Sequence, residues 1–131
     1  LFSNNQNEFY SLNALTGFIN WKQKINSNLR PTIIDEFIFS VSLEGFLFVM
    51  DRRTGSIIRI TDIFDVFREK KRSNIKPIEF VIGSKNIFLT TNNGRLLIID
   101  IKIGKTLELI KIDGDSVSRP FIVKKNLYVI K

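Results

Sequence analysis

Residues 30–61 read RPTIIDEFIFSVSLEGFLFVMDRRTGSIIRIT, and this stretch decides the fold. It holds four short apolar runs, which are Thr32–Ile34, Phe37–Val41, Phe46–Met50 and Ser56–Ile60. Polar or glycine-containing turns separate them. Short runs rich in Ile, Phe and Val, bounded by such turns, predict strands joined by hairpins. We therefore expect residues 30–61 to form one four-stranded antiparallel sheet.

The same pattern occurs a second time over residues 77–112. Its predicted strands are Ile78–Ile82, Ile87–Thr91, Arg95–Asp100 and Thr106–Ile112. A central turn recurs as well, as Leu43-Glu44-Gly45 in the first copy and as Asn92-Asn93-Gly94 in the second, and Asn-Gly is a strong hairpin signal. Four antiparallel strands in each unit of about 40 residues are typical of a β-propeller blade.

Two further markers recur along the chain in the same order. One is a turn with Asn or Asp four residues before Gly, at residues 13–17, 51–55 and 100–104. The Asx side chain accepts local backbone N–H groups, and Gly supplies the positive φ of a tight reversal. The other marker is a cation before proline, in the pairs Arg30-Pro31, Lys76-Pro77 and Arg119-Pro120, and each pair opens an apolar run. Proline at a strand start loses no ladder bond.

These repeats predict an all-β chain, a partial β-propeller with about three blades' worth of four-stranded antiparallel sheets and one short helix inserted between blades. Residues 1–29 are expected to end one blade with strands Glu8–Leu12 and Phe18–Lys24, and residues 113–131 to start another with Phe121–Val123 and Asn126–Ile130. Strands such as Phe37–Val41 are apolar on both faces, which suits a blade packed between two neighbours. An ordinary β-sandwich with regular hairpins is the alternative.

Length and composition limit the possible functions. The chain has 131 residues, of which 44% are hydrophobic, and a net charge of +7; it contains 21 Ile and 12 Phe but one Ala. Without Cys or His, it has no disulfide, no Cys- or His-ligated zinc and no Ser-His-Asp or Cys-His constellation. No apolar run approaches the roughly 20 residues of a membrane-spanning helix. The smallest propeller needs roughly 160 residues, so further blades or further copies would be required to close a ring.

Residues 62–76 form an insertion between the two complete blades. Ile63, Phe64, Val66 and Phe67 fall at helix-compatible spacings with Asp62 as a cap, which predicts a short amphipathic helix. The basic run Arg68–Arg72 follows at its end and favours a helix C-terminus. Residues 68–76 hold five cations and one anion, so +4 of the net charge of +7 lies there. We expect a docking patch for an acidic partner or a membrane surface, made of Arg68, Lys70, Lys71 and Arg72. A solvated helix end is the alternative.

The cations of the cation–proline pairs are a second candidate site. The first strand of a propeller blade lines the central channel, so Arg30, Lys76 and Arg119 would ring one mouth of that channel and attract carboxylates or phosphates. The alternative is that strand starts near solvent accept any long polar side chain. Trp21, which lies four residues after Gly17, is expected to pack between blades.

The unit from Arg30-Pro31 through Gly45 to Asp51 and Thr54-Gly55 resembles the pyrroloquinoline-quinone-like (PQQ-like) propeller repeat. That repeat runs from Pro through an apolar strand and Asp-Gly to Ala-Leu-Asp-x-x-Thr-Gly and a tryptophan. Trp21 stands where the tryptophan falls, whereas Arg59 and Glu108 take that place in the other units. The match is partial in each blade but spans nearly the whole chain.

The resemblance implies a non-catalytic scaffold of the BamB type that binds protein partners, possible outer-membrane assembly components among them. It implies no cofactor, and a periplasmic location with a possible outer-membrane anchor. Open blade edges would favour self-association. A fragment of a quinone-dependent dehydrogenase is the alternative. Nucleic-acid binding is not expected, because aromatic residues do not alternate with the cations of residues 68–76.

Overall fold

The computed structural model describes residues 2–3, 8–27, 29–114, 120–123 and 125–130. They divide into two compact units, with the boundary between Ile60 and Thr61. Nearly all of the regular structure is antiparallel β-sheet. The fold therefore belongs to the all-β class, as the sequence predicts.

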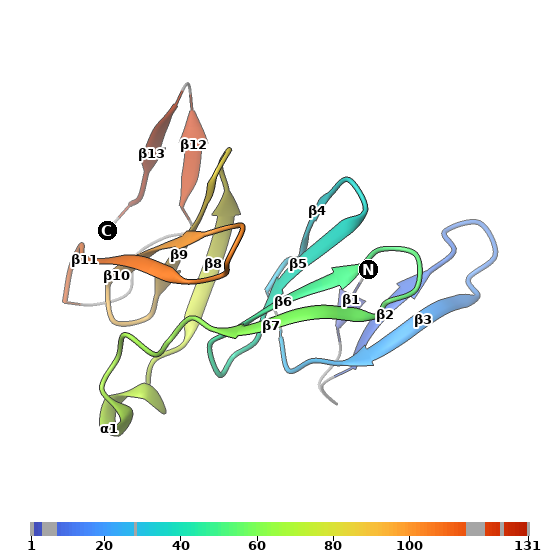
Figure 1. The fold of residues 1–131 in the computed structure, drawn as a ribbon, viewed down its shortest axis with the longest axis horizontal. Coiled ribbons are helices and arrows are strands. Elements are labelled where there is room, and N and C mark those ends of the chain that lie inside the picture. The colour runs from blue at the N-terminus through green and yellow to red at the C-terminus, as the bar shows by residue number, and fades with distance from the viewer. Residues whose placement is uncertain (1, 4–7, 28, 115–119, 124, 131) are drawn as a thin grey trace. The chain divides into compact units, whose positions relative to one another are not determined.

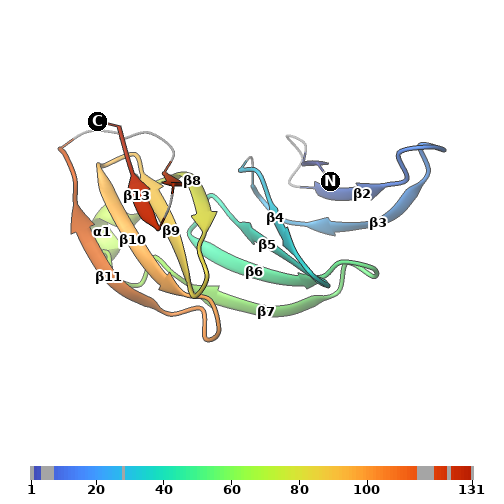
Figure 2. The same ribbon diagram turned by 90° about the horizontal axis from the view of Figure 1, so that it is seen from above.

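The first unit holds two sheets, and in each sheet the neighbouring strands are consecutive along the chain (Figures 1 and 2). The smaller sheet consists of β1 (Phe2–Ser3), β2 (Glu8–Leu12) and β3 (Ile19–Lys24). The larger sheet consists of β4 (Thr32–Ile34), β5 (Phe37–Val41), β6 (Phe46–Asp51) and β7 (Ile57–Asp62), whose last residues cross the unit boundary. Both are the meanders that the repeat predicts.

The second unit holds one complete four-stranded sheet and a separate hairpin. The sheet consists of β8 (Pro77–Ile82), β9 (Asn86–Thr91), β10 (Arg95–Asp100) and β11 (Thr106–Lys111), again in consecutive order. The hairpin consists of β12 (Phe121–Val123) and β13 (Asn126–Tyr128). The predicted strands of both repeats are thus confirmed, with their ends shifted by one or two residues.

Burial follows the pattern expected for blades that are covered on both faces. Along β5, Ile38, Phe39, Ser40 and Val41 are all buried although successive side chains point to opposite faces. In the first unit the core that joins the two sheets contains Phe9, Trp21, Ile25, Ile38 and Met50. This core comes from β2 and β3 together with β5 and β6, so two successive sheets pack face to face.

The insertion contains a short helix, as predicted, but the helix covers only the C-terminal part of the expected stretch. Helix α1 spans Glu69–Arg72, whereas residues 63–67, which were expected to be helical, form an irregular turn. Both Ile63 and Phe64 are completely buried, and the Phe64 N–H donates to Asp62 Oδ1 (3.1 Å). Burying two adjacent side chains is better served by this local turn than by a surface helix, which buries one stripe. The prediction is therefore wrong for residues 63–67, which precede the helix.

Candidate functional site

Trp21 forms the joint between the two sheets of the first unit. Its indole stacks on Phe9 with ring centroids 6.0 Å apart, and its Nε1–H donates to the carbonyl of Arg52 (3.0 Å). One face of the ring covers Gly55, and the neighbouring Gln23 Nε2–H donates to the Gly55 carbonyl (2.8 Å). The expectation that Trp21 packs between blades is confirmed.

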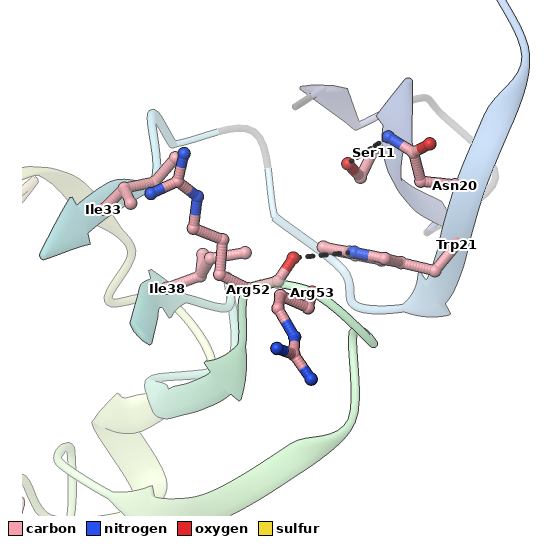
Figure 3. A pocket seen from close by; sticks show the side chains of 7 residues that line it. All are labelled: Ser11, Asn20, Trp21, Ile33, Ile38, Arg52 and Arg53. Carbon is pink, nitrogen blue, oxygen red and sulfur yellow. Dashed lines mark hydrogen bonds between the residues drawn. The ribbon is translucent and has the colours of Figure 1, made fainter. Parts of the chain in front are cut away.

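A hollow of about 580 Å³ opens beside this joint (Figure 3). It is lined by side chains from both sheets of the first unit, which are Ser11, Asn20, Trp21, Ile33, Ile38, Arg52 and Arg53. In Figure 3 the Arg52 side chain reaches toward Ile33, which is 45% exposed, and a guanidinium N–H of Arg52 donates to the Asp35 carbonyl (3.4 Å). The Arg52 guanidinium beside this exposed apolar side chain suits a carboxylate with an apolar neighbour, whereas the Arg53 side chain points away from Ile33 in Figure 3.

The basic insertion is anchored by one of its own cations. Arg72 donates two hydrogen bonds to the carboxylate of Asp62, at 2.7 Å and 2.5 Å. The side chain of Arg72 is 24% exposed, and the hydrogen bond to Asp62 raises the pKa of its guanidinium above the ordinary value. Arg72 therefore holds α1 against the end of β7. Of the predicted docking patch, Arg68, Lys70 and Lys71 are exposed.

A second hollow, of about 470 Å³, lies beside α1 in the second unit. Three cations line it together with polar and apolar neighbours, and the lining residues are Lys70, Lys71, Asn74, Ile75, Asn92, Asn93, Arg95 and Gly114. Among these described residues there is no acidic side chain, so the charges at the hollow are positive. We call this site the basic hollow.

The frame of the basic hollow is held by hydrogen bonds between loops far apart in the sequence. Asn92 Nδ2–H donates to the Asn74 carbonyl (3.0 Å), and Asn92 Oδ1 accepts from the Lys76 N–H (2.9 Å). Arg95 donates to the carbonyls of Asn93 (2.9 Å) and Asp113 (3.0 Å). Because these bonds tie the α1 loop to the β9–β10 turn, the lysines of α1 are carried on an ordered support.

The structure does not bring the cations of the three cation–proline pairs together in one unit. Arg30 and Lys76 are both exposed, but they belong to different units, and Arg119 lies outside the described residues. The ring at a channel mouth therefore stays a prediction. Sequence reasoning missed Arg52, Arg53 and Arg95. A signal existed for the first two, since the turn at residues 51–55 carries two arginines where the first turn carries Ala14 and Leu15.

Comparison with known proteins gives one family and one kind of fold. Residues 1–61 match the family described as outer membrane protein assembly factor BamB. A comparison with curated protein sequences found no significant match. The crystal structure of BamB from Moraxella catarrhalis matches with a TM-score of 0.67 and 16% identity, over 96% of this chain and 38% of that one.

Other solved structures share the fold, and one of them is named as a dehydrogenase. Sqt1 from Saccharomyces cerevisiae matches with a TM-score of 0.76 and 14% identity, over 93% of this chain and 37% of that one. A europium-containing methanol dehydrogenase matches with 0.62 and 17%, over 83% and 22%. These likenesses show the fold. Together with the family match, they confirm a partial propeller with PQQ-like, BamB-like repeats, and the chain spans about 38% of the BamB structure.

No helix in the described part of the chain combines the length and apolar character needed to cross a bilayer.

Proposed function

We propose that this chain is part of a non-catalytic, BamB-like propeller scaffold that binds an acidic segment of a partner protein. The observation that carries the proposal is the basic hollow. Lys70, Lys71 and Arg95 converge on one concave site, with no acidic side chain among its described lining residues. Opposite charge at such a site steers and orients a partner.

The surroundings of the cations favour a peptide over a simple counter-ion. Ile75, which lines the hollow, is 5% exposed and anchors the loop. The Asn92 amide is used in the frame of the hollow, and Asn74 and Asn93 contribute the other side-chain amides of the lining. Amides hydrogen-bond to a peptide backbone, and lysine ammonium groups pair with carboxylates. The hollow of about 580 Å³ in the first unit is also lined by two cations, Arg52 and Arg53, and could bind a further carboxylate.

The family match supports a place for this scaffold among proteins of the outer membrane. Residues 1–61 match the family described as an outer membrane protein assembly factor. From this we infer a periplasmic scaffold, associated with the outer membrane, whose partners include components of that assembly. Chemical cross-linking of the full-length protein in its own cells tests the location. Partners found solely in the cytoplasm would contradict it.

Peptide binding tests the basic hollow directly. The probe is a fluorescein-labelled peptide of repeated Asp-Glu-Leu units, followed by anisotropy with the full-length protein. We expect Lys70→Glu with Lys71→Glu to weaken binding about tenfold or more, because two attractive charges become repulsive. Lys102→Glu with Lys105→Glu is the matched control, since it changes the same charge on an exposed turn of the same unit. Equal weakening by both pairs would leave net charge as the cause and end the proposal.

The non-catalytic part of the proposal has a separate test, because quinoprotein dehydrogenases share the fold. The full-length protein is incubated with pyrroloquinoline quinone, calcium and a panel of alcohols and sugars. Reduction of an artificial electron acceptor is then followed. We expect no turnover above that of the same mixture without protein. Sustained turnover would contradict the non-catalytic scaffold and indicate a dehydrogenase.

A further inference from the structure

The turn between β9 and β10, which borders the basic hollow, has a counterpart between β5 and β6 in the first repeat. In both turns the residue after the glycine donates its backbone N–H to a hydroxyl at 3.2 Å, from Phe46 to Ser42 Oγ and from Arg95 to Thr91 Oγ1. The glycine N–H of each turn donates to the carbonyl of that same Ser or Thr, at 3.1 Å and 3.2 Å. Because the turn accepts an aromatic residue as readily as a cation, its backbone does not require Arg95.

Each of the two turns borders a hollow of about 470 Å³, but the hollows differ in charge. The lining of the first hollow includes Glu44 and Phe46, on either side of the turn glycine. In the basic hollow, Asn93 takes the place of Glu44 and Arg95 takes the place of Phe46. Compared with the first repeat, the second therefore lacks a carboxylate and has a guanidinium at one position of the fold. Since the turn needs neither difference, both differences point to a role of the hollow in binding anions.

The guanidinium of Arg95 is held in place by one of its nitrogens. The two hydrogens of Nη1 are donated to the carbonyls of Asn93 (2.9 Å) and Asp113 (3.0 Å). In the part of the chain that the structure describes, no hydrogen bond uses Nε or Nη2, and no ion pair joins Arg95 to a carboxylate. Nε and Nη2 form one edge of the guanidinium plane, and two parallel N–H groups on such an edge match the two oxygens of a carboxylate.

The two lysines of the basic hollow are held less firmly than Arg95. Lys70 and Lys71 are exposed on α1, and among the described residues no ion pair holds either ammonium group. An ammonium group on a flexible four-carbon stem attracts a carboxylate without fixing its direction. Arg95, in contrast, is half-buried and presents a planar group in a fixed orientation. The lysines are therefore suited to attraction, and Arg95 is suited to the placement of one particular carboxylate.

We propose that Arg95 is the specificity-determining residue of the basic hollow. Its Nε–Nη2 edge binds one Asp or Glu carboxylate of the partner segment through two parallel hydrogen bonds, while Lys70 and Lys71 attract the remaining acidic side chains. This inference rests on the acidic segment proposed above, and it adds that one carboxylate of that segment has a fixed place. The position of this carboxylate then sets the register in which the segment lies on the hollow.

The experiment combines one change in the protein with one change in the peptide. The probe is the fluorescein-labelled peptide Gly-Asp-Leu-Glu-Gly-Leu-Asp-Gly, in which each acid is replaced in turn by its amide, and binding to the full-length protein is followed by anisotropy. Arg95→Lys keeps the charge but loses the paired N–H groups, so we expect binding about tenfold weaker. One of the three amide peptides should show the same loss with the wild type and no further loss with Arg95→Lys. Lys70→Arg with Lys71→Arg is the matched control, which should leave the affinity unchanged because it also keeps the charge.

Hydrogen–deuterium exchange of Asn92 and Ile112, whose N–H groups donate to the carbonyls of Lys76 (2.9 Å) and Gly94 (2.8 Å), reports whether the frame of the hollow survives Arg95→Lys. If the frame is lost, the three amide peptides with the wild type decide: one dominant loss supports the inference, and three equal losses overturn it. An Arg95→Lys variant that is intact and binds like the wild type would also overturn it, while the acidic segment proposed above would stand. A wild type that binds none of the peptides would overturn both.

Discussion

The three turn glycines allow one prediction to be worked through in detail. We consider Gly17→Ala, Gly55→Ala and Gly104→Ala, which add the same methyl group to the same backbone conformation, with φ +75°, +73° and +70°. The left-handed conformation costs an L-residue roughly 1–2 kcal/mol, and this part is common to all three. Differences in the loss of unfolding free energy among the three variants therefore report which side chains pack on each glycine.

Gly55→Ala is expected to be the most destabilising of the three. Its Cβ would lie inside van der Waals distance of three ring atoms of Trp21, 2.8 Å from Cγ. The ring has no room to move aside, since it stacks on Phe9 and its Nε1–H donates to the Arg52 carbonyl. Overpacking adds about 1–3 kcal/mol, so the total loss is about 2–5 kcal/mol. For Gly17→Ala, the added Cβ meets no atom within 4 Å, so only the cost of the left-handed backbone, roughly 1–2 kcal/mol, is expected.

The assay is urea unfolding followed by the fluorescence of Trp21, the single tryptophan of the chain. Because Gly17 and Gly55 lie in the same unit as Trp21, their unfolding midpoints are compared directly. Gly104→Ala, whose Cβ meets the smaller Thr61 side chain, is followed by circular dichroism. If Gly55→Ala loses no more stability than Gly17→Ala, the packing of Trp21 on Gly55 is refuted.

Three further predictions concern single polar contacts. Asp62→Asn removes the charge that holds Arg72, so we expect the amides of α1 to exchange about tenfold faster in hydrogen–deuterium exchange; unchanged rates would contradict this anchor. Backbone hydrogen bonds from Thr54 and Arg53 lower the pKa of the Asp51 carboxyl below its ordinary value. The charged carboxylate therefore stabilises the fold at pH values above the unfolded-state pKa, and this stabilisation is lost as the pH falls through the lower folded-state pKa. The urea midpoints of the wild type and Asp51→Asn should therefore converge from about pH 5 to about pH 2, and a constant gap would exclude this role. Trp21→Phe removes the N–H that donates to the Arg52 carbonyl together with part of the buried ring, so the unfolding free energy should fall by more than about 1 kcal/mol; an unchanged urea midpoint, followed by circular dichroism, would show that neither the bond nor the packing contributes.

The strands could be read from the sequence because their determinants are local. Runs such as Phe37–Val41 and the turn ending at Gly55 carry their own conformational preferences, and repetition of the pattern made each copy support the other. The same local reading failed over residues 63–67. There, Ile63 and Phe64 are both buried in the core of the second unit, and a periodic pattern cannot foresee this tertiary burial.

The candidate site also combines features that local sequence predicts with features that depend on long-range contacts. Lys70 and Lys71 were found as part of a charge run, but nothing local associated them with Arg95, about 25 positions along the chain. Nor did the sequence separate Arg72 from its neighbours; the structure does so by pairing Arg72 with Asp62. Long-range contacts decide such partners, and they depend on how the whole chain packs.

The sequence alone determined the strand order, the three Asx–Gly turns and the blade-like repeat, because hydrogen-bonding propensities and apolar patterns act over a few residues. Only the tertiary structure decided that Trp21 lies on Gly55, that Thr61 lies on Gly104 and which cations share a hollow. Coverage and convergence are properties of surfaces brought together by packing. They are therefore settled when the sheets pack against one another, and the three turns differ in surroundings while sharing one backbone.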